Sequence, residues 1–307
     1  MKLRIASLVL LWMASSLPAS PVIEKKVYDI SIMSKGAGPK FYLDYACFQG
    51  FEKLTYVEFY LQVPYHELQF IKHKKKFKAS YEFELKIVDQ DNQVIEHKKN
   101  YDTFEVGTFT ETESLQRARI SLLAVTLAPG DYDLEIILLD TETRYNTQVE
   151  RPFQVKNFQL SNLLISDIQF SQKIKPAEEG QPYVKCGRYI EPIAMRNFGH
   201  GTNEYFYVYF EVYNLNTKAS DGTDETEHVY TTEYIFSDEA GKKIAHLKRD
   251  IPKPGPTSAH SLRFGVEKLN SGLYTLQIRI LDAATGQTSA TSKSFRILEI
   301  PVSVSQL

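Results

Sequence analysis

The residues best suited to binding lie in one tyrosine-rich stretch, YFYVYFEVY at residues 205–213. Successive side chains of a strand point to opposite faces, so the tyrosines gather on the face that carries no phenylalanine or valine. This candidate binding face comprises Tyr205, Tyr207, Tyr209 and Tyr213. A tyrosine ring is flat and apolar with a polar tip, so such a face could stack a sugar or grip a peptide. Cross-strand tyrosine pairing, which only stabilises a sheet, is the open alternative.

Two clusters of charge could attract other ligands. The basic run KHKKKFK at residues 72–78 could attract anionic glycans or membrane phosphates, or simply form a solvated loop before the next strand. The acidic run SDGTDETE at residues 220–227 lacks the alternating ligand spacing and closing glutamate of a calcium loop. We therefore predict no metal site in the acidic run.

Motifs for catalysis are missing from the sequence. HELQF at residues 66–70 has Phe70 where a zinc protease needs its second histidine. There is no Gly-x-Ser-x-Gly nucleophile elbow, and no glycine loop that would cradle a phosphate follows a strand. Cys47 could act as a nucleophile only beside an ordered histidine. The sequence thus predicts no catalytic residue, no cofactor and no enzyme.

The elements that position these residues come from a repeat. APGDYDLEIILLD at residues 128–140 returns as NSGLYTLQIRILD at residues 270–282, and the alignment of the two segments pairs Tyr132 with Tyr274. Strands predicted at 132–139 and 273–281 begin at or beside these tyrosines. Because the two segments are separated by nearly half of the chain, they indicate a duplicated domain rather than a solenoid of short repeats.

Both copies are predicted to consist of strands. Runs rich in Val, Ile, Tyr and Phe alternate with polar residues and end at turn residues. Seven or eight such strands in each copy favour an all-β fold with two tandem immunoglobulin-like β-sandwich domains after a signal peptide. The predicted domains are residues 24–156 and residues 159–300, followed by a C-terminal tail at 301–307.

The repeated strand also carries two structural predictions. Tyr132 and Tyr274 each fit a tyrosine corner, in which the ring packs inward and the hydroxyl binds backbone of the preceding loop, although a plain core tyrosine is the alternative. The other face differs between the copies: it is Asp133, Glu135, Ile137 and Leu139 in the first copy, apolar at the far end, and the mostly polar Thr275, Gln277, Arg279 and Leu281 in the second. A strand that is apolar on both faces is covered on both. We therefore expect Ile137 and Leu139 to meet domain 2 or a partner.

The first residues predict export. Lys2 and Arg4 precede an apolar run and then small residues, the layout of a secretory signal peptide that is cleaved near residue 19. The apolar run is too short to span a bilayer and no second run of spanning length exists, so the mature chain should contain no transmembrane segment. The formal net charge of −2 argues against nucleic acid as a partner. Cys47 and Cys186 are predicted to be buried free thiols, with a disulfide between the copies as the alternative.

Two segments resemble a known family. FYLDYACFQGFEKLTYVEFYLQVPYHELQFI (41–71) and RYIEPIAMRNFGHGTNEYFYVYFEVYNL (188–215) are similar to the β domains of bacterial GWxTD-domain proteins. The Gly-Trp-x-Thr-Asp module itself is absent, and the single tryptophan is Trp12. The resemblance implies a bacterial exported protein and supplies no catalytic residue.

Together these observations predict a non-enzymatic exported protein, periplasmic or extracellular. Its expected role is to bind a protein or to assemble at the cell envelope. The alternative is a carbohydrate-binding module that uses the tyrosine face, so a glycan ligand stays possible.

Overall fold

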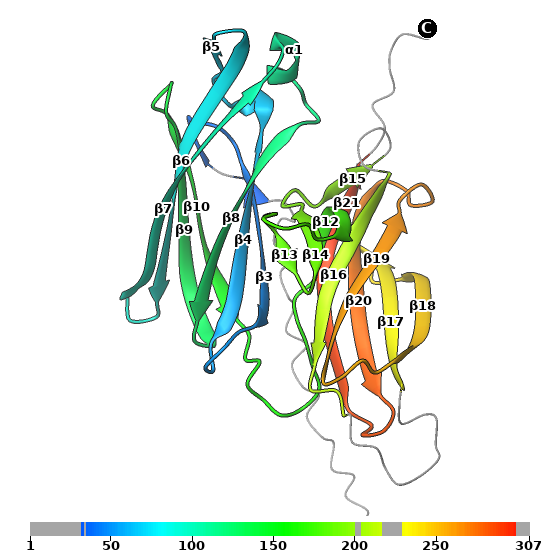
Figure 1. The fold of residues 1–307 in the computed structure, drawn as a ribbon. Coiled ribbons are helices and arrows are strands. Elements are labelled where there is room, and N and C mark those ends of the chain that lie inside the picture. The colour runs from blue at the N-terminus through cyan, green and yellow to red at the C-terminus, as the bar shows by residue number, and fades with distance from the viewer. Residues whose placement is uncertain (1–31, 34, 200–203, 217–228, 299–307) are drawn as a thin grey trace, which may run out of the picture.

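The computed structural model describes residues 32–33, 35–199, 204–216 and 229–298. Strands dominate this part of the chain, and its helical elements are the single turns η1 (Tyr65–Glu67) and α1 (Phe109–Thr112). The all-β prediction is confirmed. The predicted signal peptide and C-terminal tail lie outside the described residues. Two pairs of sheets lie side by side (Figure 1), and we refer to them as domain 1 and domain 2.

Domain 1 packs a sheet of four strands against a sheet of six. The first sheet has the order β1 (Ile32–Met33), β3 (Tyr42–Gln49), β4 (Thr55–Pro64), β8 (Ala118–Leu127). The second has the order β2 (Lys35–Gly36), β10 (Asn146–Val155), β9 (Gly130–Asp140), β6 (Lys76–Asp89), and β6 also pairs with β5 (Ile71–His73) and β7 (Val94–Val106). Apolar side chains at alternate positions meet between the sheets, for example Phe59 of β4 and Ile136 of β9.

Domain 2 repeats this plan. One sheet contains β13 (Val184–Lys185), β14 (Arg188–Pro192), β12 (Gln169–Pro176), β11 (Leu164–Ile165), β16 (Tyr205–Tyr213) and β19 (Thr257–Gly265). The other has the order β15 (Asn197–Gly199), β21 (Thr288–Leu298), β20 (Gly272–Asp282), β17 (Val229–Asp238), β18 (Lys243–Pro252). The order β10–β9–β6–β7 in domain 1 thus matches β21–β20–β17–β18 in domain 2.

The predicted strands agree best with the structure where the repeat is strongest. Strands predicted at 132–139 and 273–281 are β9 and β20, which have the same length and begin and end at equivalent positions of the repeat. Agreement is weakest at the start of domain 2, where runs predicted at 160–170 and 184–194 are each broken into two short strands.

Both tyrosine corners are confirmed. The Tyr132 hydroxyl donates to the Ala128 carbonyl at 3.0 Å, and the Tyr274 hydroxyl donates to the Asn270 carbonyl at 2.9 Å. Both rings belong to the core of their own domain. The corners therefore tie the loop that enters β9 or β20 to the strand itself.

Replacing either corner tyrosine by phenylalanine should destabilise the protein. Tyr132→Phe and Tyr274→Phe are each expected to lower the free energy of unfolding by about 1 kcal/mol, because a loop carbonyl loses its donor while the ring stays in place. Urea denaturation measures the change. Tyr101→Phe is the control, since the Tyr101 side chain is half exposed on β7. If all three variants unfold at the same urea concentration, the corners contribute nothing to stability.

The two domains meet through a small core of their own. Ala46, Phe48 and Tyr60 from domain 1 pack against a matching set from domain 2, which is Ile190, Ala194 and Tyr209. All six side chains are 2% exposed or less. The sheet that holds β3 and β4 therefore has two buried faces, one toward its own sandwich and one toward domain 2.

Candidate functional site

The predicted tyrosine face is divided by the domain interface. Tyr209 and Tyr213 are 0% and 2% exposed, so they are not available to a ligand from solvent, and the prediction is wrong for both. Their outward face is covered by domain 1: the Tyr209 ring lies 6.0 Å from that of Phe48, and the Tyr213 hydroxyl accepts from the Gln49 amide at 3.1 Å. Tyr205, which is 45% exposed, and the partly exposed Tyr207 remain at the surface.

A buried ion pair occupies the same interface. Lys185 of domain 2 pairs with Glu58 of domain 1, and their side chains are 11% and 3% exposed. The Lys185 ammonium also lies over the Phe48 ring, 4.8 Å from its centroid. Burial lowers the pKa of Lys185, and the Glu58 carboxylate opposes this shift. Aromatic and charged groups together therefore hold the two domains at one angle.

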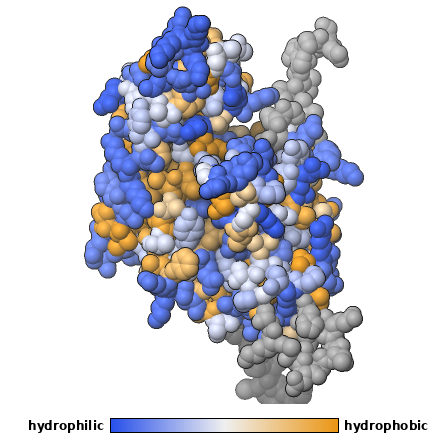
Figure 2. All heavy atoms as spheres, in the orientation of Figure 1, coloured by the Kyte–Doolittle hydropathy of each residue, from blue (hydrophilic) through white to orange (hydrophobic). Residues whose placement is uncertain are grey.

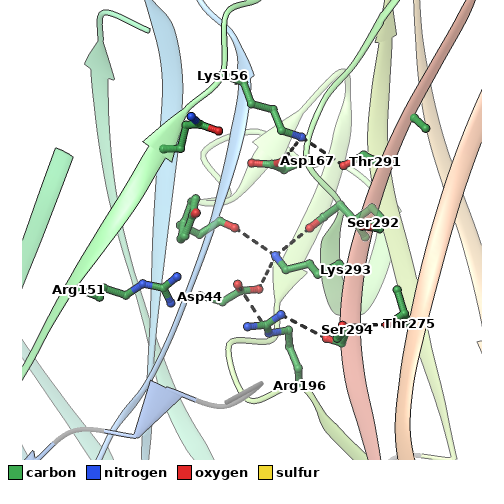
Figure 3. Close-up of a pocket in the computed structure, with 14 residues that line it drawn as sticks. Asp44, Arg151, Lys156, Asp167, Arg196, Thr275, Thr291, Ser292, Lys293 and Ser294 are labelled. Carbon is green, nitrogen blue, oxygen red and sulfur yellow. Dashed lines mark hydrogen bonds and ion pairs between the residues drawn. The ribbon is translucent and has the colours of Figure 1, made fainter. Parts of the chain in front are cut away.

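A second group of charges lines a cleft of about 690 Å³ between the domains, shown in Figure 3. Domain 1 supplies residues of β3 and β10, and domain 2 supplies residues of β20 and β21. Four cations face two carboxylates in this cleft: Arg151, Lys156, Arg196 and Lys293 against Asp44 and Asp167. We refer to this set as the junction cleft. Its walls carry more positive than negative charge, which favours an anionic ligand.

Lys293 is the centre of the junction cleft. Its ammonium lies 2.6 Å from the Asp44 carboxylate, and it donates to the carbonyls of Tyr45 at 3.1 Å and Ile168 at 2.9 Å. The Lys293 and Asp44 side chains are 10% and 5% exposed. Burial lowers the pKa of Lys293, and Asp44 opposes the shift. Arg196, whose guanidinium donates to the Ser294 carbonyl at 3.2 Å, lies 3.8 Å from the same carboxylate.

A second ion pair lies beside Lys293. Lys156 is 2.5 Å from Asp167 and donates to the Thr291 hydroxyl at 3.2 Å. Asp167 in turn accepts from the Cys47 amide at 2.9 Å, which ties the start of domain 2 to β3. The Lys156 side chain is 38% exposed, so one side of this pair faces solvent.

Sequence reasoning missed the junction cleft, although the repeat contains a signal for it. When the copies are aligned on Tyr132 and Tyr274, Arg151 and Lys293 stand at the same position of β10 and β21. Each lies two positions before a phenylalanine, Phe153 or Phe295, that belongs to the core of its own domain. The matching cations Arg151 and Lys293 therefore mark the part of each sandwich that faces the other domain across the cleft.

The remaining predicted residues fall elsewhere. Ile137 and Leu139 are partly exposed and lie on the outer face of the β10–β9–β6 sheet, opposite residues such as Gln148 and Glu84. Domain 2 packs on the other sheet of domain 1, so contact between these residues and domain 2 was a wrong prediction. A partner on this face stays a prediction.

The cysteines do not pair. Cys47 is buried, and burial raises the pKa of its thiol, with Asp167 adding to the shift. This environment disfavours the thiolate that a nucleophile needs. Cys186 is exposed, so its predicted burial was wrong. It stands beside Gly187 in the two-residue turn between β13 and β14, and its Sγ lies 3.9 Å from Glu211.

The described residues that line the junction cleft carry cationic and hydroxyl groups besides the two carboxylates. In this part of the chain, no group of three or more His, Cys, Asp or Glu residues could hold a metal ion. No helix within it is long and apolar enough to cross a membrane. The junction cleft instead offers cationic donors and the hydroxyls of Thr275, Thr291, Ser292 and Ser294.

Comparison with known proteins does not place the chain in a family. No protein-family model and no curated protein sequence matches it. It is similar to a β-glucuronidase 2 of Bacteroides uniformis at 12% identity and a TM-score of 0.22, covering 78% of this chain and 26% of that one. It is also similar to dimeric latent PorU from Porphyromonas gingivalis (12%, TM-score 0.28, 92% and 22% covered) and to a putative β-galactosidase from Bacteroides fragilis (10%, TM-score 0.24, 81% and 33% covered). The chain thus spans a third or less of the length of these structures.

Proposed function

We propose that this chain is a non-enzymatic, exported binding protein of the bacterial cell envelope. In this proposal its two sandwiches act as one rigid unit, and the junction cleft holds an acidic segment of a protein partner. The observation that carries the proposal is the placement of four cations around one interdomain cleft. The N-terminal sequence and the resemblance of residues 41–71 and 188–215 to GWxTD-domain proteins support export and a bacterial source.

The rigid junction favours binding over a closing motion. Six interface side chains are buried, and the Lys185–Glu58 and Lys293–Asp44 pairs bridge the domains out of water. Opening the interface would expose the apolar surface of these six side chains to water and would separate both ion pairs. A cleft that keeps its shape loses little entropy when it takes up a partner, because its walls are already ordered.

The cleft favours a protein segment over a sugar. Its cations can donate charge-assisted hydrogen bonds to the carboxylates of an acidic protein segment. The carbohydrate alternative depended on four exposed tyrosines, of which Tyr205 and Tyr207 remain at the surface. Their rings lie 5.9 Å apart and at 89° to each other, so they do not form one flat platform for a sugar ring.

Reversing a cleft charge should release the partner. We expect Arg151→Glu to reduce capture of the partner at least about tenfold, because the loss of a cation and the gain of a carboxylate repel an acidic segment. The full chain with a C-terminal tag is expressed in its own cells and crosslinked, and the captured proteins are quantified by mass spectrometry. Lys268→Glu is the matched control, since Lys268 is exposed in the turn before β20 and outside the cleft lining.

The supporting result is one protein that the wild-type and Lys268→Glu chains capture and the Arg151→Glu chain does not. Thermal unfolding of each chain separates lost binding from lost folding, and Arg151→Gln replaces the glutamate variant if that variant unfolds. Equal capture by all folded chains, or capture by none, would contradict the proposal.

A further inference from the structure

One end of domain 1 carries an exposed basic hairpin. Strands β5 and β6 are joined by a two-residue turn of Lys74 and Lys75, since His73 pairs with Lys76. All residues from 71 to 76 are exposed. Lys74 has φ +55°, the left-handed region that glycine, asparagine and aspartate adopt most easily. The turn therefore has a lysine at position 74, where a glycine or an asparagine would fit the backbone better.

Apolar side chains are exposed at the same end. Phe109 of α1 is 63% exposed, and its ring lies 5.8 Å from that of Phe77 in the hairpin. Leu115, in the segment after α1, is 80% exposed. Thr108 and Glu111 form a capping box that holds this single helical turn in place. Figure 1 shows β5 and α1 together at the end of domain 1, and Figure 2 shows that end as mainly hydrophilic.

The charges at this end are mostly positive. The run of residues 72–78 contains five lysines. Glu105 neutralises part of this charge, through ion pairs with His73 at 2.7 Å and Lys76 at 3.2 Å, and both pairs lower the pKa of Glu105. Among the described residues, no acidic side chain forms an ion pair with Lys72, Lys74 or Lys75. These three lysines, together with Phe109 and Leu115, are called the basic tip.

We propose that the basic tip docks the protein on a bilayer that contains anionic lipid. Lysines attract the headgroup phosphates, and the nearby phenylalanine and leucine enter the boundary between headgroups and acyl chains. The exposed apolar side chains favour a bilayer over a soluble anionic polysaccharide, which could satisfy the lysines but offers no apolar layer for Phe109 and Leu115. This site is independent of the junction cleft, which uses none of these residues.

Vesicle sedimentation tests the proposal. The full-length protein is mixed with vesicles of phosphatidylcholine alone, or of phosphatidylcholine and phosphatidylglycerol in equal parts. We expect binding to the anionic vesicles only, and weaker binding as salt rises. The triple variant Lys72→Glu, Lys74→Glu, Lys75→Glu should bind at least about a hundredfold more weakly, because each lysine near an anionic surface contributes roughly fivefold.

Two further variants separate general charge effects from the basic tip. Lys242→Glu, Lys243→Glu, Lys248→Glu changes the net charge equally, at exposed positions on and beside β18 in domain 2, and should leave binding unchanged. Phe109→Ser, Leu115→Ser keeps every lysine and should weaken vesicle binding about tenfold or more, since the apolar contribution is lost.

The controls also decide between a bilayer and other anions. Dextran sulfate binding is measured for the wild type and for Phe109→Ser, Leu115→Ser, and it should be equal for both, because a soluble polyanion contacts the lysines and offers no apolar layer. Equal vesicle binding by the serine variant, equal weakening by the domain 2 variant, or no binding to anionic vesicles would overturn the proposal.

Discussion

Asp44→Ala is expected to lower the free energy of unfolding by about 3–5 kcal/mol, because it leaves a buried ammonium without its carboxylate. Lys293 and Asp44 are 2.6 Å apart and almost fully buried where the domains meet. In Asp44→Ala the Lys293 ammonium keeps its hydrogen bonds to the carbonyls of Tyr45 and Ile168, but these carbonyls do not neutralise the charge of the ammonium. Urea denaturation of the full chain, followed by circular dichroism, measures the change.

An ion pair of the same length provides the matched control. Lys99 and Glu82 are also 2.6 Å apart, but their side chains are 60% and 29% exposed. Glu82→Ala should therefore have a much smaller effect, because solvent screens an exposed ion pair. The double variant Asp44→Leu, Lys293→Met removes both charges of this pair and should recover part of the stability lost in Asp44→Ala, although Arg196 still loses its carboxylate neighbour. If Asp44→Ala costs no more than Glu82→Ala, the buried pair does not hold the junction together.

The repeat made the strands predictable, because the same tyrosine and the same closing aspartate occur at equivalent positions of a strand in both copies. Tyr132 and Tyr274 identify one corner twice, and the hydroxyl contacts confirm both. The closing aspartates of the repeated strand also have one role in both copies. Asp140 accepts from the amide two positions later, and Asp282 does the same, so each stabilises the turn that follows its strand.

The domain interface could not be predicted from the alternation of side chains along a strand. The pattern of 205–213 places Tyr209 and Tyr213 away from the core of their own sandwich, which is correct. It does not say whether that outer face meets water or another domain. Here the outer faces of β4 and β16 cover each other, so tyrosines that resembled a ligand platform are interface residues. Their polar tips are satisfied by Glu211, to which both hydroxyls donate.

The junction cleft was only partly hidden in the sequence. A cation two positions before the core phenylalanine of β10 and of β21 is visible once the copies are aligned on Tyr132 and Tyr274. The partners of those cations are not visible, because Asp44 lies in β3 of domain 1 whereas Lys293 lies in β21 of domain 2, far away along the chain. Contacts at such separation depend on how the sandwiches dock, and docking depends on shape as well as on side-chain type.

His260 gives domain 2 a buried titratable group. Its ring stacks on Phe210, with centroids 4.6 Å apart and an angle of 5°, and its Nε2 lies 2.5 Å from the Tyr230 hydroxyl. That hydroxyl donates to Ser258 at 2.8 Å. Burial lowers the pKa of His260 to about 4, and the positive charge of Arg188 adds to the shift. The folded protein therefore holds this histidine neutral at a pH where an unfolded chain would protonate it.

This difference predicts that domain 2 loses stability in mild acid. Between the unfolded pKa of 6.5 and the folded pKa of about 4, the unfolded state binds more protons than the folded state, so the free energy of unfolding falls as pH falls. The full contribution of His260 is present above pH 6.5, and its loss should reach about 3 kcal/mol near pH 4. Urea denaturation across this range measures the slope in the wild type and in His260→Gln. Carboxylates contribute equally to both proteins, so the difference between the two slopes isolates His260, and identical slopes would show that the histidine does not titrate on unfolding.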